Sequence, residues 1–164
     1  MNSCWKLTPP GLPPLRSNIT DINLGDYYDS DPFVADNSTK AWRNDGVGLE
    51  LEIVNALDDT WQDEFEQAVS DWDGGSPDTL TLTVSRGEVD YSCKEQDGVL
   101  KVCSGNFGDS GWLGINDLLF IESTGEVISS VAKMNEFYLR NGDSDTRFYT
   151  MCHEIGHGFG LPHT

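Results

Sequence analysis

The sequence predicts an α+β fold, in which a group of strands lies between two helices along the chain. Two patterns carry this prediction. Apolar residues recur every three or four positions from Val54 to Trp72, as on one face of an amphipathic helix, and a second stripe of this kind runs from Phe148 to Phe159. Between them, Thr79–Ser85 alternates polar and apolar residues with the period of a strand, and further apolar runs follow. Because helices and strands are segregated in this order, the class is α+β.

Length, composition and charge narrow the function. A chain of 164 residues forms one domain or slightly more, and its five Trp and seven Phe can supply a core. The net charge of −18 argues against nucleic acid as a partner, because phosphate contacts need a basic patch, and against an anionic membrane surface. No segment approaches the roughly 18 apolar residues of a transmembrane helix. We therefore expect a soluble protein without a nucleic-acid or membrane partner.

Residues 1–45 are predicted to be weakly structured and to precede a domain formed by residues 46–164. Thr8–Pro14 has the composition of a polyproline-type linker. Asp26–Asp31 and Asp36-Asn37 make an acidic loop whose oxygens suit a structural calcium ion, although the spacing is not that of an EF-hand and a solvated loop is the alternative. No apolar leader is visible, so the expectation is either a cytosolic protein or a chain that lacks its true start.

The first predicted helix lies within Gly48–Asp73. Asp58 or Asp59 can cap its start, and Gly74-Gly75 ends it. Its apolar stripe predicts a core-facing side.

The later elements are strands and a capped helix. A glycine-rich loop enters a strand within residues 102–121, which is predicted to be broken or bulged near Gly114. Another strand lies within Val127–Leu139, and Ser144 or Asp145 caps the last helix.

Four cysteines are present in the chain. Cys93 and Cys103 flank a polar segment with a turn signal at Asp97-Gly98. A disulfide between them would close a hairpin-like loop and add about 2–3 kcal/mol to the stability of the fold. Such a bond implies an oxidising compartment, whereas two reduced, buried thiols are the alternative. Cys152 lies on the core face of the last helix, where it pairs with Cys4, pairs with a residue outside this chain, or stays free.

The last stretch, Phe148–Thr164, holds all three histidines of the protein in the spacing H-E-x-x-H-x-x-G-x-x-H. His153 and His157 lie one helical turn apart with a rise of about 6 Å, so both imidazoles can reach one ion. Zinc binds histidine nitrogen at roughly 2.0–2.1 Å, and three protein ligands leave a fourth position for water, as in catalytic zinc sites. The apolar residues of the same helix, which predict that its other face packs on a core, are Phe148, Cys152, Ile155 and Phe159.

The remaining residues of the motif also suit this chemistry. Glu154 points about 100° around the helix from its neighbour, so it can reach a water on the ion more easily than the ion itself. Gly160 lets the backbone leave the helix in a left-handed conformation, and Pro162 cannot continue the helix. The chain can then turn back and deliver His163 as the third ligand. The alternative is a helix with surface histidines and no metal, since HExxH alone occurs by chance.

The full motif resembles the zinc motif of the metzincin metalloproteases. Residues 48–164 resemble the matrixin-like branch, especially secreted microbial members, with support from Cys103–Gly108, Gly111–Ile115 and Ala132–Tyr138. The resemblance implies a twisted, mostly parallel sheet with an antiparallel edge strand, backed by two helices of which the second carries the zinc motif. It also implies an edge segment on which a peptide substrate pairs as an added strand, formed by Gly111, Trp112, Leu113, Gly114 and Ile115.

The activity implied by the resemblance is that of an extracellular zinc endopeptidase acting on proteins or peptides. Zinc held by His153, His157 and His163 would polarise the scissile carbonyl, while Glu154 would take a proton from the attacking water and pass it to the leaving amine. No covalent intermediate is required.

One departure from the family concerns the end of the sequence. The family has a methionine turn beneath the zinc and a lower subdomain, whereas this sequence ends one residue after His163, and Met134 and Met151 both lie upstream. We therefore expect residues 46–164 to be an upper subdomain, within a fragment or a truncated gene product. Two alternatives are a zinc-binding but catalytically incomplete fragment or pseudoenzyme, and an acidic extracellular binding module that depends on calcium.

Overall fold

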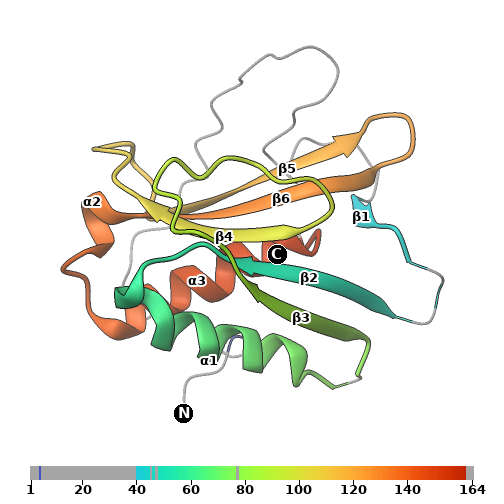
Figure 1. Ribbon diagram of the computed structural model, residues 1–164, viewed down its shortest axis with the longest axis horizontal. Helices are drawn as coiled ribbons and strands as arrows, with labels where there is room; N and C mark the ends of the chain where they lie inside the picture. Colours follow the sequence, from blue (N-terminus) through green and yellow to red (C-terminus); the bar gives the residue numbers. More distant parts are fainter. Residues whose placement is uncertain (1–3, 5–39, 45, 47, 77, 162–164) are drawn as a thin grey trace.

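A computed structural model of the chain describes residues 4, 40–44, 46, 48–76 and 78–161. The fold is α+β, with a mostly parallel sheet backed by helices, as predicted (Figure 1). A 3₁₀ turn, η1, lies at Asp59–Trp61, directly before the first helix. In chain order the other elements are β1 (Ala41–Trp42), β2 (Leu49–Asn55), α1 (Gln62–Asp73), β3 (Leu80–Arg86), β4 (Leu100–Gly105), β5 (Gly114–Ile121), β6 (Glu126–Asn135), α2 (Glu136–Leu139) and α3 (Ser144–Gly158).

The sheet runs in the order β3, β2, β4, β6, β5, and β1 pairs with the first residues of β6. Every pairing is parallel except that of β5 with β6, which is antiparallel. The register shift of this antiparallel pair lies between Leu119 and Phe120, and β5 begins at Gly114. The prediction of a break near Gly114 was therefore wrong, because this glycine starts the strand and the irregularity comes five residues later.

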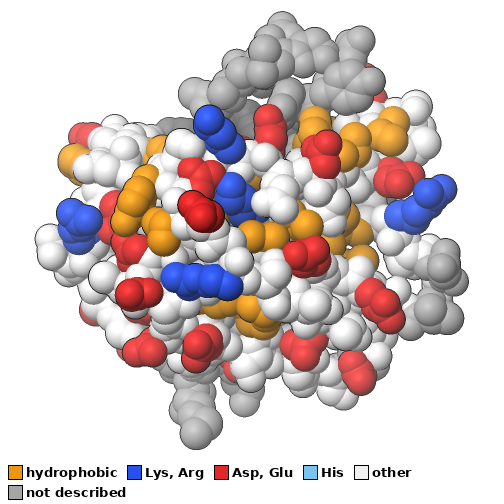
Figure 2. All heavy atoms as spheres, in the orientation of Figure 1, with side chains coloured by type: hydrophobic (Ala, Val, Ile, Leu, Met, Phe, Trp, Pro, Cys, Tyr) orange, Lys and Arg blue, Asp and Glu red, His pale blue; other side chains and the backbone are white. Residues whose placement is uncertain are grey.

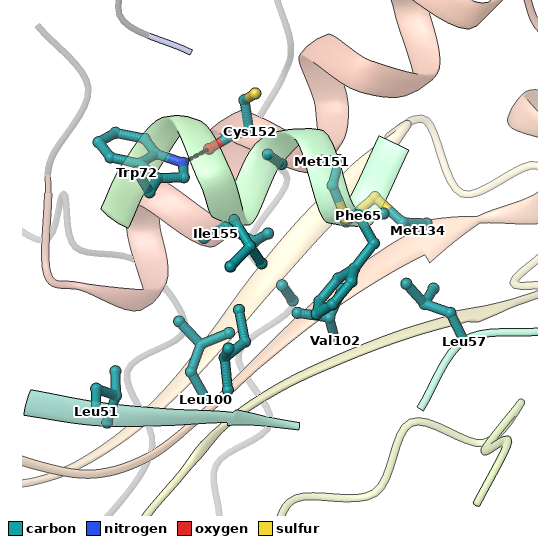
Figure 3. Close-up of a cluster of buried hydrophobic side chains, with 14 of the residues drawn as sticks. Leu51, Leu57, Phe65, Trp72, Leu100, Val102, Met134, Met151, Cys152 and Ile155 are labelled. Carbon is teal, nitrogen blue, oxygen red and sulfur yellow. Dashed lines mark hydrogen bonds between the residues drawn. The ribbon is translucent and has the colours of Figure 1, made fainter. Parts of the chain in front are cut away.

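Both long helices pack on one face of the sheet and form the main core with it. Alternate strand residues such as Ile53 and Val102 point toward the helices, as the two-residue period of a strand requires. Figure 3 shows the helix side chains Phe65, Met151 and Ile155 meeting this face, and the indole nitrogen of Trp72 in α1 donating to the Cys152 carbonyl of α3 at 3.1 Å. The predicted apolar stripe of α3 is confirmed, since Phe148, Cys152 and Ile155 are buried and Phe159 packs against the core.

A smaller apolar cluster covers part of the other face of the sheet. It consists of Ala56, Cys93, Cys103 and Val131, with Phe107 packed against it. The predicted disulfide between Cys93 and Cys103 is confirmed, and it ties the connection between β3 and β4 to the sheet.

The strand β2 was missed by the sequence analysis, which placed Val54 on the first helix. The helical spacing of Val54, Leu57 and Trp61 arises by coincidence across a strand, a loop and a 3₁₀ turn. The residues of β2 instead form parallel ladders with β3 and β4. The helical segment starts later, after Asp58, whose carboxylate accepts from the Thr60 amide at 2.9 Å. Gly74 follows its last residue, as predicted.

Two element boundaries near the C-terminus also differ from the prediction. The strand predicted within Val127–Leu139 ends at Asn135, because the Asn135 side chain accepts from the Phe137 amide and starts the short helix α2. The N-cap of α3 is Asp143, whose carboxylate accepts from the Thr146 amide at 2.9 Å, and not Ser144 or Asp145. Asn135 and Asp143 both have the extended backbone of an N-cap residue.

Part of the segment predicted to be weakly structured is tied to the domain. Ala41 and Trp42 form β1 against Glu126 and Val127, and the Trp42 side chain is buried. Cys4 forms a disulfide with Cys152 of α3. The polyproline-type segment and the acidic loop from Asp26 to Asn37 lie outside the described residues.

The surface is acidic, in keeping with the net charge of −18. Figure 2 shows Asp and Glu side chains spread over the whole of one face, with fewer Lys and Arg side chains among them. Within the described ranges, no helix has the length and apolar character needed to cross a membrane.

Candidate functional site

The candidate site is built on the last turns of α3, which carry His153, Glu154 and His157. The helix is fixed from three sides in this region. Its core face packs on the sheet, Trp72 of α1 binds the Cys152 carbonyl, and the Trp42 indole donates to the Gly158 carbonyl at 2.7 Å. The motif therefore lies on a rigid element, as a site with precise geometry requires.

The two imidazoles on α3 converge. The Nε2 atoms of His153 and His157 lie 2.9 Å apart, and the two rings are nearly perpendicular, at 87°. His157 is buried and His153 is half-buried. In a tetrahedral site with zinc–nitrogen bonds of roughly 2.0–2.1 Å, two nitrogen ligands are about 3.3 Å apart. A small outward movement of either ring would therefore let both nitrogens bind one ion.

The orientation of His157 is set by a main-chain contact. Its Nδ1 lies 2.7 Å from the Leu161 carbonyl, and because a carbonyl can only accept, Nδ1 carries the hydrogen. The lone pair of the neutral ring is then on Nε2, the atom that faces His153. A hydrogen bond from the other ring nitrogen to a carbonyl is the usual way in which proteins orient a metal-binding histidine.

The chain leaves α3 as the motif predicts. Gly160 has φ of +90°, the left-handed region expected of it. A Cβ atom at this position would clash with the carbonyl oxygen of Lys40, the residue before β1, so this close approach also requires glycine. The predicted third ligand, His163, lies outside the described residues, as does Pro162. Among the residues that are described, no group of three His, Cys, Asp or Glu side chains could hold a metal ion.

Glu154 is a buried carboxylic acid beside the two histidines. Its side chain is 3% exposed, and within the described part of the chain no Lys or Arg pairs with it. Burial and, to a smaller extent, the negative charge of Asp117 together raise the pKa of Glu154 to about 8. A carboxyl group whose pKa is raised in this way is unusual in a protein interior and marks a candidate functional residue.

The predicted substrate segment borders Glu154 at one end. Gly114 and Ile115 belong to β5, and a Cβ atom on Gly114 would lie 2.7 Å from Glu154 Cγ and 3.0 Å from its Oε1. Gly111, Trp112 and Leu113 form the loop that leads into the strand. The structure thus brings one end of this segment into contact with Glu154.

Asn135 and Tyr138 hold this loop, a role that the sequence analysis did not assign to them. The Asn135 side chain binds the main chain of Phe107, Gly108 and Trp112, at 3.0, 3.0 and 3.3 Å, and the Ser110 hydroxyl at 2.9 Å. The Tyr138 hydroxyl accepts from the Gly111 amide at 3.0 Å and donates to Asp109. Both residues lie in the Ala132–Tyr138 segment that carried part of the resemblance, but no local pattern marks them as loop-binding residues.

Cys152 forms a disulfide with Cys4, which is one of the three alternatives that the sequence left open for it. The bond attaches the N-terminal end of the chain to α3 at the residue directly before His153. The Cys4 amide also donates to Asp71 of α1 at 3.0 Å. Neither sulfur is free in this structure to bind metal or to act as a nucleophile.

Comparisons with protein families, with curated proteins and with solved structures find no significant match to this chain.

Proposed function

We propose that the chain is a zinc-dependent metalloendopeptidase of the matrixin-like metzincin type. The observation that carries the proposal is the convergence of His153 and His157, whose Nε2 atoms are 2.9 Å apart, on a helix that also carries the buried Glu154 between them in the sequence. The motif adds a third histidine, His163, at the spacing of a catalytic zinc site.

The fold supports the same assignment. A mostly parallel sheet with one antiparallel strand at its edge, and a second long helix that carries the histidines, is the arrangement that the resemblance implies.

The donor set fits zinc. Imidazole nitrogen is a common zinc ligand, and the Leu161 carbonyl already holds His157 in the tautomer that a metal requires. His153, His157 and His163 would hold the ion, which when bound supplies Lewis-acid activation of a water and of the scissile carbonyl. Glu154 would accept a proton at its carboxylate and deliver it to the leaving amine.

The edge strand β5 is the proposed place for the substrate. Among the described strands β5 pairs only with β6, and we place the added peptide strand along its other edge. Main-chain bonds of this kind tolerate many sequences, which suits a protease acting on proteins or peptides. Nucleic acid and membrane surfaces are not proposed as partners, given the charge of −18.

The two disulfides are compatible with an oxidising compartment, so we place the protein outside the cell. A calcium-dependent role has no support from the described residues, and calcium stays an expectation for the acidic loop alone.

The proposal is tested by measuring the zinc content of the purified chain together with hydrolysis of casein. We expect one zinc per chain and measurable hydrolysis, with both lost in His157→Ala. His163→Ala should weaken zinc binding as well, because it removes the predicted third ligand. Zinc without hydrolysis would favour the catalytically incomplete alternative. A folded chain that binds no zinc at micromolar metal would contradict the proposal.

A further inference from the structure

A buried asparagine links the edge strand to the helix that carries the motif. Asn116 lies in β5 and is 3% exposed. Its Nδ2 donates to the main-chain carbonyl of Glu154 at 2.8 Å, and its Oδ1 accepts from the Ser130 hydroxyl of β6 at 2.9 Å. Because Nδ2 can only donate and Oδ1 can only accept, these two hydrogen bonds fix the orientation of the Asn116 amide.

The partner on the helix is the peptide between the two histidines. The carbonyl of Glu154 lies in the turn that spans His153 and His157, so a shift of this carbonyl moves both imidazoles and the Glu154 side chain together. The contact is buried, and a hydrogen bond there is stronger than at the surface and its loss is costly.

A second contact on the same face of β5 fixes the distance between the strand and the helix. Gly114 lies two residues before Asn116, and residues two apart on a strand share a face. The missing side chain at Gly114 leaves the space into which the Glu154 carboxyl fits, since a Cβ there would lie 2.7 Å from Cγ. Strand and helix therefore meet through a notch at Gly114 and a hydrogen bond at Asn116.

We propose that Asn116 is a positioning residue. Its hydrogen bond fixes the distance between β5 and the turn of α3 that carries Glu154. The proposal rests on the proposed function, because it matters for catalysis only if a peptide lies along β5. A substrate paired with β5 is then placed relative to Glu154 through Asn116, and a misplacement of about 1 Å can cost about 100-fold in rate.

The test compares Asn116→Ala with a matched control, Asn55→Ala. Asn55 is also buried, at 4% exposed, and its amide is likewise engaged at both ends, by Gln62 Oε1 at 2.8 Å and by the Leu57 amide at 3.1 Å. Its partners are Leu57, in the loop after β2, and Gln62, the first residue of α1. Loss of the Asn55 amide should therefore cost similar stability without affecting the turn that carries Glu154.

For hydrolysis of an internally quenched peptide by the zinc-loaded full chain, Asn116→Ala should lower kcat about 10- to 100-fold while KM changes less than about twofold. Asn55→Ala should leave kcat within about twofold of the wild type. Ser130→Ala keeps the hydrogen bond from Asn116 to Glu154 but removes the hydroxyl that orients Asn116. It should therefore lower kcat about three- to tenfold. This variant replaces Asn116→Ala in the test if Asn116→Ala does not fold. Equal kcat values in the Asn116, Ser130 and Asn55 variants would overturn the proposal.

A second readout needs neither zinc nor activity. In the metal-free protein, the imidazole nitrogen NMR signals of His153 and His157 should shift in Asn116→Ala and, less, in Ser130→Ala, but not in Asn55→Ala. If the wild type does not hydrolyse peptide and these shifts are present, the proposed function fails while the positioning role stands. Histidine signals unchanged in both the Asn116 and the Ser130 variants would overturn the positioning role whatever the activity.

Discussion

Two buried glutamates, Glu64 and Glu154, differ in whether a basic side chain pairs with them. Glu64 contacts the first half of α3, and Glu154 belongs to its second half. Glu64, in α1, is 8% exposed and accepts from Arg147 Nε of α3 at 2.7 Å. Glu154, within α3, is 3% exposed, and the described residues offer it no basic partner. Glu64 forms an ion pair with Arg147. By contrast, burial and the charge of Asp117 raise the pKa of Glu154 to about 8.

The pair at Glu64 has the features of a structural contact. The Arg147 guanidinium also donates to the Leu139 and Thr60 carbonyls and lies 3.7 Å from the ring centroid of Trp61. It thereby joins α1, α2 and the first half of α3. Every charge in this cluster has a partner, which is the condition under which a buried ion pair is tolerated.

The difference between the two glutamates fits the functional role that we propose for Glu154. Burial of a carboxyl group without a cationic partner is costly, and such groups cluster at functional sites. The first half of α3 is anchored through Arg147, and the second half carries the residues of the proposed site.

The largest effect on stability is expected at the Glu64 end. Arg147→Met leaves the Glu64 carboxylate buried without its cation and should lower the free energy of unfolding by about 3–5 kcal/mol. Adding Glu64→Leu should restore most of this loss, because an apolar pair of similar volume needs no partner. Urea unfolding measures both variants. Hydrolysis per folded molecule should stay unchanged. A loss of hydrolysis in the fully folded double variant would contradict the assignment of a structural role to Glu64 and a catalytic role to Glu154.

A smaller, pH-dependent effect is expected at Asp90, another paired carboxylate. Burial alone would raise the pKa of Asp90, but hydrogen bonds from Lys101, at 2.6 Å, and from Ser92 and the Lys94 amide outweigh it and hold the pKa well below its ordinary value. A lowered pKa in the folded state means that this contribution is present above the unfolded pKa of about 3.9 and is lost as the pH falls below it.

Asp90→Asn should therefore cost about 1–2 kcal/mol at pH 7 and progressively less as the pH falls from 4 toward 2. Urea unfolding of both proteins across this range is the measurement. A loss that is the same at pH 7 and at pH 2.5 would show that the charge of Asp90 is not what stabilises the fold. In that case, pairing would not be the property that separates structural carboxylates from Glu154.

The sequence predicted those parts of the molecule that depend on local spacing. The apolar face of α3, the left-handed Gly160 and the disulfide between Cys93 and Cys103 each have a signal within about ten residues, and all three are confirmed. The zinc ligands and the role of Glu154 stay predictions, since His163 lies outside the described residues.

What the sequence did not predict depends on residues that are far apart in the chain. The disulfide from Cys4 to Cys152 spans 148 positions, and nothing near either cysteine identifies its partner. The strand β2 was hidden because one apolar spacing continued from it into a helix. The roles of Asn116 and Asn135 arise from hydrogen bonds to other elements, and a buried amide looks like a surface amide in a sequence.

The most direct test of the central claim compares Glu154→Gln with Glu64→Gln for zinc content and for casein hydrolysis. Both changes keep the size of the side chain and remove its ability to take up and release a proton. We predict that Glu154→Gln stays folded, keeps its zinc and loses hydrolysis by at least about 100-fold, as expected for a general base. Glu64→Gln should lose stability but keep hydrolysis per folded molecule. Hydrolysis at the wild-type rate by zinc-loaded Glu154→Gln would contradict the account.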